Sequence, residues 1–403
     1  MARKALSGIK VLEWAQMVAG PYCTKQLADM GAEVIKIEGP GKGDKARSRE
    51  PFLNNVPHPE RSGLFLYLNT NKRGITLDVK NPKGKKIFQE LVKDVDIFVE
   101  DNPPKLMEEL KLTYEELKEI NPGLIMTSIT PFGQTGPYRD YKAYPLNTFH
   151  SGGEGYVTPS ASPSLDREPL TIGRYFGEYA VAIVSAGAIL AALFAREATG
   201  SGQHIDISKQ ETLSYLAAWD IQNYARSGTV TTRETKIARM RAIYQCKDGY
   251  ILFAPVGAKE LEWWSLFFQA LIYPEVDERF FDLNYLSENK RELAPLRREL
   301  LMKKTREEIF NTPQARECPL APFLKPGEVV ESEQIKHRGF FKEVDHPEAG
   351  RLKYPTTAYQ FSKMPWEAER AAPLLGQHNE EIYCQQLGYS KEDLTKLREG
   401  EVI

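Results

Sequence analysis

EPLTIGRYFGEYAVAIVSAGAILAALFAREATGSGQ, residues 168–203, is the stretch that decides the fold. Between Tyr179 and Ala195 it contains apolar residues, one serine, one glycine and the tyrosine at its edge. This run is slightly short for a membrane span and has no anchoring residues at its flanks, so it predicts a fully buried helix in a protein core. The turn-forming residues 199–202 then end the helix.

One carboxylate, Glu178, stands at the start of this helix, directly after Gly177. An acid in the first turn of a helix lies near the positive end of the helix dipole, which keeps it anionic and able to act as a nucleophile. An acid is also common at this position simply because it stabilises the helix start. Position alone favours that simpler interpretation, so the rest of the chain has to decide.

Length, charge and cysteine usage exclude several classes of protein. The 403 residues are enough for two domains. Lys and Arg number 53 against 55 Asp and Glu, so no basic excess indicates nucleic acid as a partner. The four cysteines are far apart and the six histidines form no metal-binding pattern, which predicts free thiols and no metal site. Residues 1–14 contain no apolar signal segment, so we expect a cytoplasmic protein without a membrane anchor.

The N-terminal half reads as alternating strands and helices. A short apolar strand at 9–12 is followed by a helix at 22–30 and a second strand at 33–37. This β-α-β pattern predicts a parallel sheet and an α/β fold. The first turn has Gly20 alone and not GxGxxG, so it is not a dinucleotide fingerprint. Further strands are expected at 74–78, 96–100, 124–129 and 204–207.

Two loops have the composition of phosphate-binding segments. The Gly-rich basic loop 39–50 directly follows a parallel strand, at the edge of the sheet where ligands gather. A solvated surface loop explains the same residues equally well. The segment 69–73 precedes the next strand, and its Lys72 and Arg73 are either phosphate ligands or surface charges.

The second half of the chain has a different character. Residues 138–173 are rich in Ser, Pro and Gly, and an irregular segment of this length usually has a function. Further on, two apolar strands are joined at Asp248-Gly249, which predicts a β-hairpin. We therefore expect a large first domain at 1–229 and a smaller α+β domain at about 230–325.

Seven segments in chain order carry a recognisable family pattern: LSGIKVLEWAQMVAGPY, LADMGAEVIKIEGPGKGD, NKRGITLDVKNPKGKKIFQELVKDVDIFVED, NPGLIMTSITPFGQTGPY, GAILAALFAREATGSGQHIDIS, CPLAPFLKPGEVVESEQIKHRGFF and PLLGQHNEEI. Together they cover nearly the whole chain. With these segments the chain resembles the class III CoA-transferases, the family that includes formyl-CoA and carnitine CoA-transferases.

The resemblance implies a fold and a set of ligand contacts. The large domain is expected to be Rossmann-like and built from both chain ends, so that 326–403 returns to it, and two chains are expected to interlock as a dimer. Val18, Ala19 and Gly20 match the family's loop near CoA and the reacting thioester. The basic loop and the Asn-Lys-Arg segment match stretches that meet the nucleotide end of CoA, which makes candidate CoA-binding residues of Lys42, Lys45, Asn71, Lys72 and Arg73.

The resemblance also implies a reaction. An aspartate of the family attacks an acyl-CoA thioester, forming a mixed anhydride and CoA thiolate; a second acid then exchanges in and receives CoA. CoA and acyl-CoA are thus substrates, and no covalently bound cofactor is expected. Glu178, five residues after Gly173, takes the place of that aspartate. Its extra methylene moves the carboxylate by about 1.5 Å, and such a displacement can cost on the order of 100-fold in rate.

Other departures from the family pattern lie nearby. A helix glycine of the family is Ile183 here, and the usual NFxPG turn reads DNPPK at 101–105. We therefore favour a catalytically silent subunit of a heteromeric CoA-transferase, in which a homologous chain supplies the aspartate. The enzymes that activate benzylsuccinate with succinyl-CoA are an example of this arrangement.

Two alternatives stay open. One is an active homodimeric CoA-transferase that uses Glu178 as its nucleophile. The other is an acyl-CoA racemase or isomerase of the same fold. Such relatives pair a histidine with an acid, and in the loop before Glu178 the only histidine is His150, which is more simply interpreted as a packed loop residue. The acyl donor and acceptor are not specified by these patterns.

Overall fold

The computed structural model describes residues 4–159, 166–233, 242–255 and 257–403. Contacts divide the chain into two units. The first comprises Met1–Thr158, Leu170–Thr229 and Gly339–Ile403, and the second comprises Pro159–Pro169 and Val230–Arg338. The small domain expected at 230–325 thus falls within the second unit, and the chain rejoins the first unit at Gly339.

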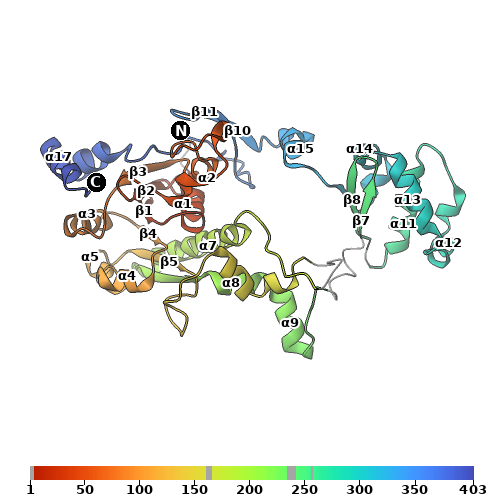
Figure 1. Cartoon of the computed structure of the whole chain (residues 1–403), viewed down its shortest axis with the longest axis horizontal. Coiled ribbons are helices and arrows are strands. Elements are labelled where there is room, and N and C mark those ends of the chain that lie inside the picture. The colour runs from red at the N-terminus through yellow and green to blue at the C-terminus, as the bar shows by residue number, and fades with distance from the viewer. Residues whose placement is uncertain (1–3, 160–165, 234–241, 256) are drawn as a thin grey trace. The chain divides into compact units, whose positions relative to one another are not determined.

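The first unit is built on a six-stranded parallel sheet of order β3-β2-β1-β4-β5-β6, which confirms the predicted α/β fold (Figure 1). Every neighbouring pair in this sheet is parallel. All the strands expected from the sequence are present. Their bounds are β1 Lys10–Trp14, β2 Glu33–Glu38, β3 Lys72–Thr76, β4 Ile97–Glu100, β5 Ile125–Thr130 and β6 Gln203–Ser208.

Alternating side chains of the strands bury two separate cores, because successive residues of a strand face opposite sides of the sheet. Leu12, Phe98 and Met126 belong to the core that includes α3 (Pro82–Val92), α5 (Tyr114–Ile120) and α17 (Lys391–Glu399). Ile97 and Ile125 belong to the other core, with α1 (Ala19–Asp29) and α7 (Phe176–Thr199). The two faces of the sheet therefore carry different helices.

Helix α7 is the predicted apolar helix, but it is not fully buried in the single chain. Val181, Ala182 and Ile189 are buried against α1 and the sheet, whereas Ile183 is 56% exposed and Phe194 is 77% exposed. In the described part of the chain, α7 alone is long and apolar enough to cross a membrane. Because one face of it forms the core of the first unit, we interpret it as a core helix whose other face is uncovered.

The segment 138–173 is more regular than expected. It contains α6 (Pro145–Ser151) and the short 3-10 helix η3 (Glu154–Val157). A proline at the first position of α6 favours a helix start, and that signal was available in the sequence. The other elements of the first unit are η1 Lys45–Ser48, η2 Leu53–Asn55, α2 Gly63–Leu68, α4 Pro104–Glu109, α8 Lys209–Leu216, α9 Ala218–Ser227, β10 Phe341–His346, β11 Gly350–Pro355 and η6 Glu380–Gln386.

The second unit contains the predicted hairpin, an antiparallel pair of β7 (Ile243–Cys246) and β8 (Gly249–Phe253). Its core is aromatic: the rings of Phe253 and Phe267 stack with centroids 4.1 Å apart. Among the described residues of the second unit, the remaining elements are α11 Glu260–Ile272, η4 Glu278–Phe281, α12 Leu283–Glu288, α13 Leu293–Lys303, α14 Arg306–Phe310, η5 Gln314–Glu317, β9 Leu320–Pro322, α15 Pro326–Glu331 and α16 Glu333–His337.

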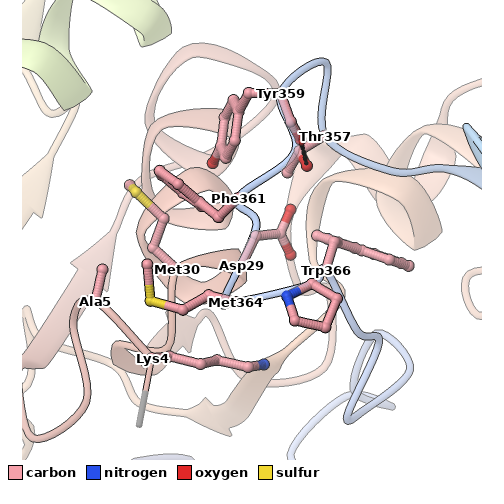
Figure 2. A pocket seen from close by; sticks show the side chains of 10 residues that line it. Lys4, Ala5, Asp29, Met30, Thr357, Tyr359, Phe361, Met364 and Trp366 are labelled. Atoms are coloured by element: carbon pink, nitrogen blue, oxygen red, sulfur yellow. Dashed lines mark hydrogen bonds between the residues drawn. The ribbon is translucent and has the colours of Figure 1, made fainter. Parts of the chain in front are cut away.

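The C-terminal part of the first unit packs on the end of α1. Figure 2 shows Tyr359, Phe361 and Trp366 around Asp29, the last residue of α1. The cavity between them measures about 20 Å³, little more than the space that one water molecule needs. These residues therefore pack the segment 357–366 against the end of α1.

Candidate functional site

Glu178 lies in the first turn of α7, as predicted, and its surroundings are unusual. The helix is preceded by Arg174 and Tyr175, which are both left-handed, with φ of 59° and 60°. Two consecutive non-glycine residues in this conformation are strained, and such strain concentrates at functional sites. The Glu178 side chain is nearly buried, and its Oε2 accepts a hydrogen bond of 2.7 Å from Nζ of Lys209, the first residue of α8.

A pocket of about 120 Å³ opens beside Glu178. It is formed by the segment 171–178, by α6 and by Leu213 of α8. Most of its lining is apolar or aromatic, so a carboxylate at its wall would meet an acyl group in a poorly hydrated place. The pocket therefore has the character expected of a site for a small acyl chain.

The loop before α1 is held by two carboxylates. The backbone N–H of Gln16 donates to Asp101, at 3.0 Å and 3.2 Å from its two oxygens, and the N–H of Met17 donates to Asp44 at 2.9 Å. Met17 has a φ of 64°, a conformation that a side chain disfavours. The two acids therefore stabilise a strained turn that leads directly into Val18.

Val18, Ala19 and Gly20 follow this turn and are buried. A Cβ on Gly20 would lie 2.3 Å from the Cβ of Ala15, so the close approach of the chain here requires glycine. No side chain caps the first turn of α1. Its leading N–H groups are the kind of donor that binds an oxyanion or another anion.

Asp101 holds the loop before α1 and, like Glu178, interacts electrostatically with Lys209. It was not predicted from the sequence as a site residue. Burial raises the pKa of Asp101 to about 7, against the opposing effects of Lys209 and of the Gln16 N–H. Lys209 thus acts on two acids, Glu178 and Asp101. The only sequence signal for Asp101 was its place in the altered turn at 101–105.

Lys72 does not lie where a phosphate could reach it. Its ammonium is fully buried and donates to Glu13 Oε2 at 2.9 Å, to the Pro21 carbonyl at 2.7 Å and to Asn69 at 2.9 Å, which uses all three N–H bonds. Burial lowers the pKa of Lys72 to about 8 in spite of Glu13. The expected contact of Lys72 with CoA therefore finds no support in this structure.

The acid that holds Lys72 is shared with a second lysine. Glu13 also accepts from Lys36 at 2.7 Å, and Lys36 forms an ion pair of 2.8 Å with Asp44. Burial alone would raise the pKa of Glu13, but Lys36 and Lys72 outweigh it and hold the pKa at about 2. This buried network connects β1, β2 and β3 to the loop that carries Asp44.

Asn71 and Arg73, the neighbours of Lys72, bind other parts of the first unit. The Asn71 side-chain carbonyl accepts from the N–H of Glu369 at 2.8 Å, and its amide donates to Asp29 at 2.8 Å. Arg73 forms ion pairs with Glu33 and Glu381. In this structure these two residues hold the C-terminal segment against the sheet.

Lys42 and Lys45, by contrast, are exposed on a firmly held loop. The N–H of Asp44 donates to Glu38 at 2.8 Å, and Arg47 pairs with the same acid at 2.7 Å. Of the candidate CoA-binding lysines, these two are free to meet a phosphate. In the described part of the chain, no group of three or more His, Cys, Asp or Glu residues is arranged to hold a metal ion.

Residues 6–379 match the family model of CoA-transferase family III. The chain therefore belongs to CoA-transferase family III, which confirms the resemblance seen in its motifs. It is 31% identical to the mouse succinyl-CoA:glutarate CoA-transferase, over 98% of this chain and 89% of that one. It is 32% identical to the succinyl-CoA–D-citramalate CoA-transferase of Chloroflexus aurantiacus, over 99% of this chain and 98% of that one.

The fold is similar to solved structures of the same group. A CAIB/BAIF family protein from Brucella suis superposes with a TM-score of 0.79 at 30% identity, covering 95% of this chain and 99% of that one. The protein Rv3272 from Mycobacterium tuberculosis superposes with a TM-score of 0.76 at 25% identity, covering 94% and 100%. The chain is thus a CoA-transferase of this family over nearly its full length.

Proposed function

We propose that this chain is the non-catalytic subunit of a heteromeric CoA-transferase, which moves CoA from succinyl-CoA to a carboxylic acid. In this proposal a homologous chain supplies the nucleophilic aspartate. The observation that carries it is the 2.7 Å ion pair between Lys209 and Glu178, at the position of the nucleophile. A nearly buried carboxylate whose charge is neutralised by an ammonium is a poor nucleophile, because the attack requires it to leave that partner.

The proposed donor is taken from the mouse and Chloroflexus aurantiacus relatives, which are both named for succinyl-CoA. Lys42 and Lys45 are the residues that we assign to the phosphates of CoA, since both are exposed on the loop that the family pattern places there. Val18, Ala19 and Gly20 are assigned to the thioester end. The uncapped N-terminus of α1 supports that assignment, because its N–H groups suit a developing oxyanion.

A homodimeric enzyme with Glu178 as nucleophile is the second candidate. It is favoured by the fact that Glu178 lines the apolar pocket of about 120 Å³. In that case Lys209 would have to release the Glu178 carboxylate during the attack. Replacing Glu178 by glutamine therefore separates the two functions.

The experiment compares the chain alone with the chain co-expressed with an Asp-bearing homologue. Transfer from succinyl-CoA is assayed with glutarate, citramalate and oxalate as acceptors. We expect the lone chain to be inactive, and the complex to keep its activity within about twofold when it carries Glu178→Gln. Activity of the lone chain that disappears with Glu178→Gln would instead establish the homodimeric enzyme. Loss of activity with Asp→Asn in the homologue, at its corresponding position, serves as the positive control.

A further inference from the structure

A second pocket lies on the opposite face of the sheet from Glu178. Strand β4 ends at Glu100, and the next residue is Asp101. Because side chains alternate along a strand, Glu100 lies on the same side as Phe98, in the core of α3 and α5, while α7 with Glu178 packs on the other side. The two pockets are therefore separated by the sheet itself.

This pocket, which we call the Glu100 pocket, measures about 170 Å³. A cavity of about 150 Å³ is known to hold a molecule of the size of benzene, so a ligand of about six heavy atoms fits. The lining includes Glu100, Met107, Tyr114, Gln134, Arg139 and His204. Met107, Met126 and the ring of Tyr114 provide an apolar wall.

Three polar atoms that line the Glu100 pocket are buried without a hydrogen-bond partner: Glu100 Oε1, Gln134 Nε2 and Arg139 Nε. Such atoms cost free energy unless a ligand or water satisfies them. Glu100 Oε2 accepts from the N–H of Asn102 at 2.7 Å. Arg139 pairs through Nη2 with Glu108, and its Nε lies 4.0 Å from the Asp140 carboxylate, beyond hydrogen-bond distance.

When Glu100 is protonated, Glu100 Oε1, Gln134 Nε2 and Arg139 Nε can each donate a hydrogen bond to a ligand. Glu100 is fully buried, and burial raises its pKa to about 7, so it is protonated in a large fraction of molecules near neutral pH. Ser128 Oγ lies 2.9 Å from His204 Nε2, and burial lowers the pKa of His204, which keeps that ring neutral. The pocket then offers donors from Gln134, Arg139 and the Glu100 carboxyl.

We propose that the Glu100 pocket is a binding site for a small carboxylate, separate from the Glu178 site. One carboxylate oxygen accepts from Gln134 and Arg139, the other accepts from protonated Glu100, and the carbon chain packs on Met107. Arg139 supplies the positive charge. This site goes beyond the proposed CoA-transfer and does not depend on which chain carries the nucleophile.

Binding of a carboxylate to protonated Glu100 is coupled to proton uptake. The titratable or charged groups that line the pocket with Glu100 are Glu108 on α4, Tyr114 on α5, Arg139 on the loop after β5, and His204 on β6; Asp101 is its neighbour in sequence. Above the pKa of Glu100, about 7, a carboxylate can bind only if a proton is taken up. The affinity is therefore expected to fall about fivefold between pH 7 and pH 8, because about half of the Glu100 carboxyls are already ionised at pH 7.

The test is titration calorimetry of the full chain with propanoate at pH 6 and pH 8. We expect binding at pH 6 to be about tenfold tighter than at pH 8. Glu100→Gln, whose amide donates at either pH, is expected to bind propanoate equally at both. Gln134→Leu should weaken binding at pH 6 by about tenfold or more, because it removes a buried donor to an anion. The matched control is Gln245→Leu, on the exposed side of β7, and it should bind like the unchanged protein.

Glu178→Gln distinguishes this site from the proposed acyl site, and propanoate binding should survive it unchanged. The proposal is overturned by equal affinity of the unchanged protein at pH 6 and pH 8, by no effect of Gln134→Leu, or by loss of binding with Glu178→Gln. Failure to bind propanoate at tens of millimolar would also overturn it. Circular dichroism checks the fold of each variant. The comparison of pH 6 with pH 8 in the unchanged protein needs no variant.

Discussion

Lys72 shows at the scale of one residue how a lysine in a family motif can have a structural role. Its ammonium lies 2.9 Å from Glu13 in the interior, between β1 and α1. We predict that Lys72→Met lowers the free energy of unfolding by about 3–5 kcal/mol, because it leaves part of the Glu13 charge buried and unpaired. Denaturant unfolding measures this effect.

Lys42→Met is the matched control, since the same change is made at an exposed lysine. It should change stability by no more than about 0.5 kcal/mol and should weaken CoA binding instead. If Lys72→Met kept full stability and weakened CoA binding, Lys72 would be a phosphate ligand after all.

Asp101 is predicted to make stability depend on pH. Its folded pKa is about 7, above the ordinary value of 3.8, so between these values the folded state holds a proton that the unfolded state has lost. The free energy of unfolding should therefore fall as pH rises through this window, by on the order of 1 kcal/mol per pH unit from this group. Asp101→Asn removes this contribution and keeps an acceptor for the Gln16 N–H.

The measurement is denaturant unfolding at several values between pH 4.5 and pH 7.5. Asp140→Asn, at an exposed aspartate, should leave the slope unchanged. An identical slope in Asp101→Asn and in the unchanged protein would show that Asp101 ionises at an ordinary pKa.

At the scale of the element, α7 carries a prediction about association. Ile183 and Phe194 are 11 residues apart, about three turns, so they lie on one face, which is exposed in the single chain. We propose that a partner subunit, homologous or identical, covers this face of α7. Ile183→Glu with Phe194→Glu should convert the assembly to single chains in analytical ultracentrifugation, because charges cannot be buried in that contact.

Ala198→Glu adds the same charge at an exposed position near the end of α7, and it should leave the assembly intact. If the double variant assembles like the unchanged protein, the exposed face of α7 is not the contact between subunits.

At the scale of the whole molecule, binding of succinyl-CoA should raise the free energy of unfolding of the first unit. Succinyl-CoA at about 100 times its dissociation constant should raise the free energy of unfolding by about 2.7 kcal/mol. The transition of the first unit is expected to shift in calorimetry, since Lys42, Lys45 and the start of α1 all belong to it. Lys42→Ala with Lys45→Ala should reduce that shift, and an unchanged shift would remove these lysines from the CoA site.

The sequence by itself determined the α/β class, the order of the strands along the chain, the hairpin and the family. These follow from periodicity, turn residues and ordered motifs, which are local properties of the chain. It also predicted that Glu178 starts a helix. The irregular segment was misjudged because α6 is short, and a single proline was its main signal.

Only the tertiary structure decided what surrounds these residues. Lys209 is 31 residues from Glu178, and Asp101 is 85 residues from Gln16, so neither contact leaves a local pattern. In the sequence Lys72 is interpreted as a phosphate ligand or a surface charge, because no local pattern reveals its partner. That partner is Glu13 on β1, 59 residues away. Burial and pairing depend on which strands become neighbours in the sheet, and that is a property of the whole fold.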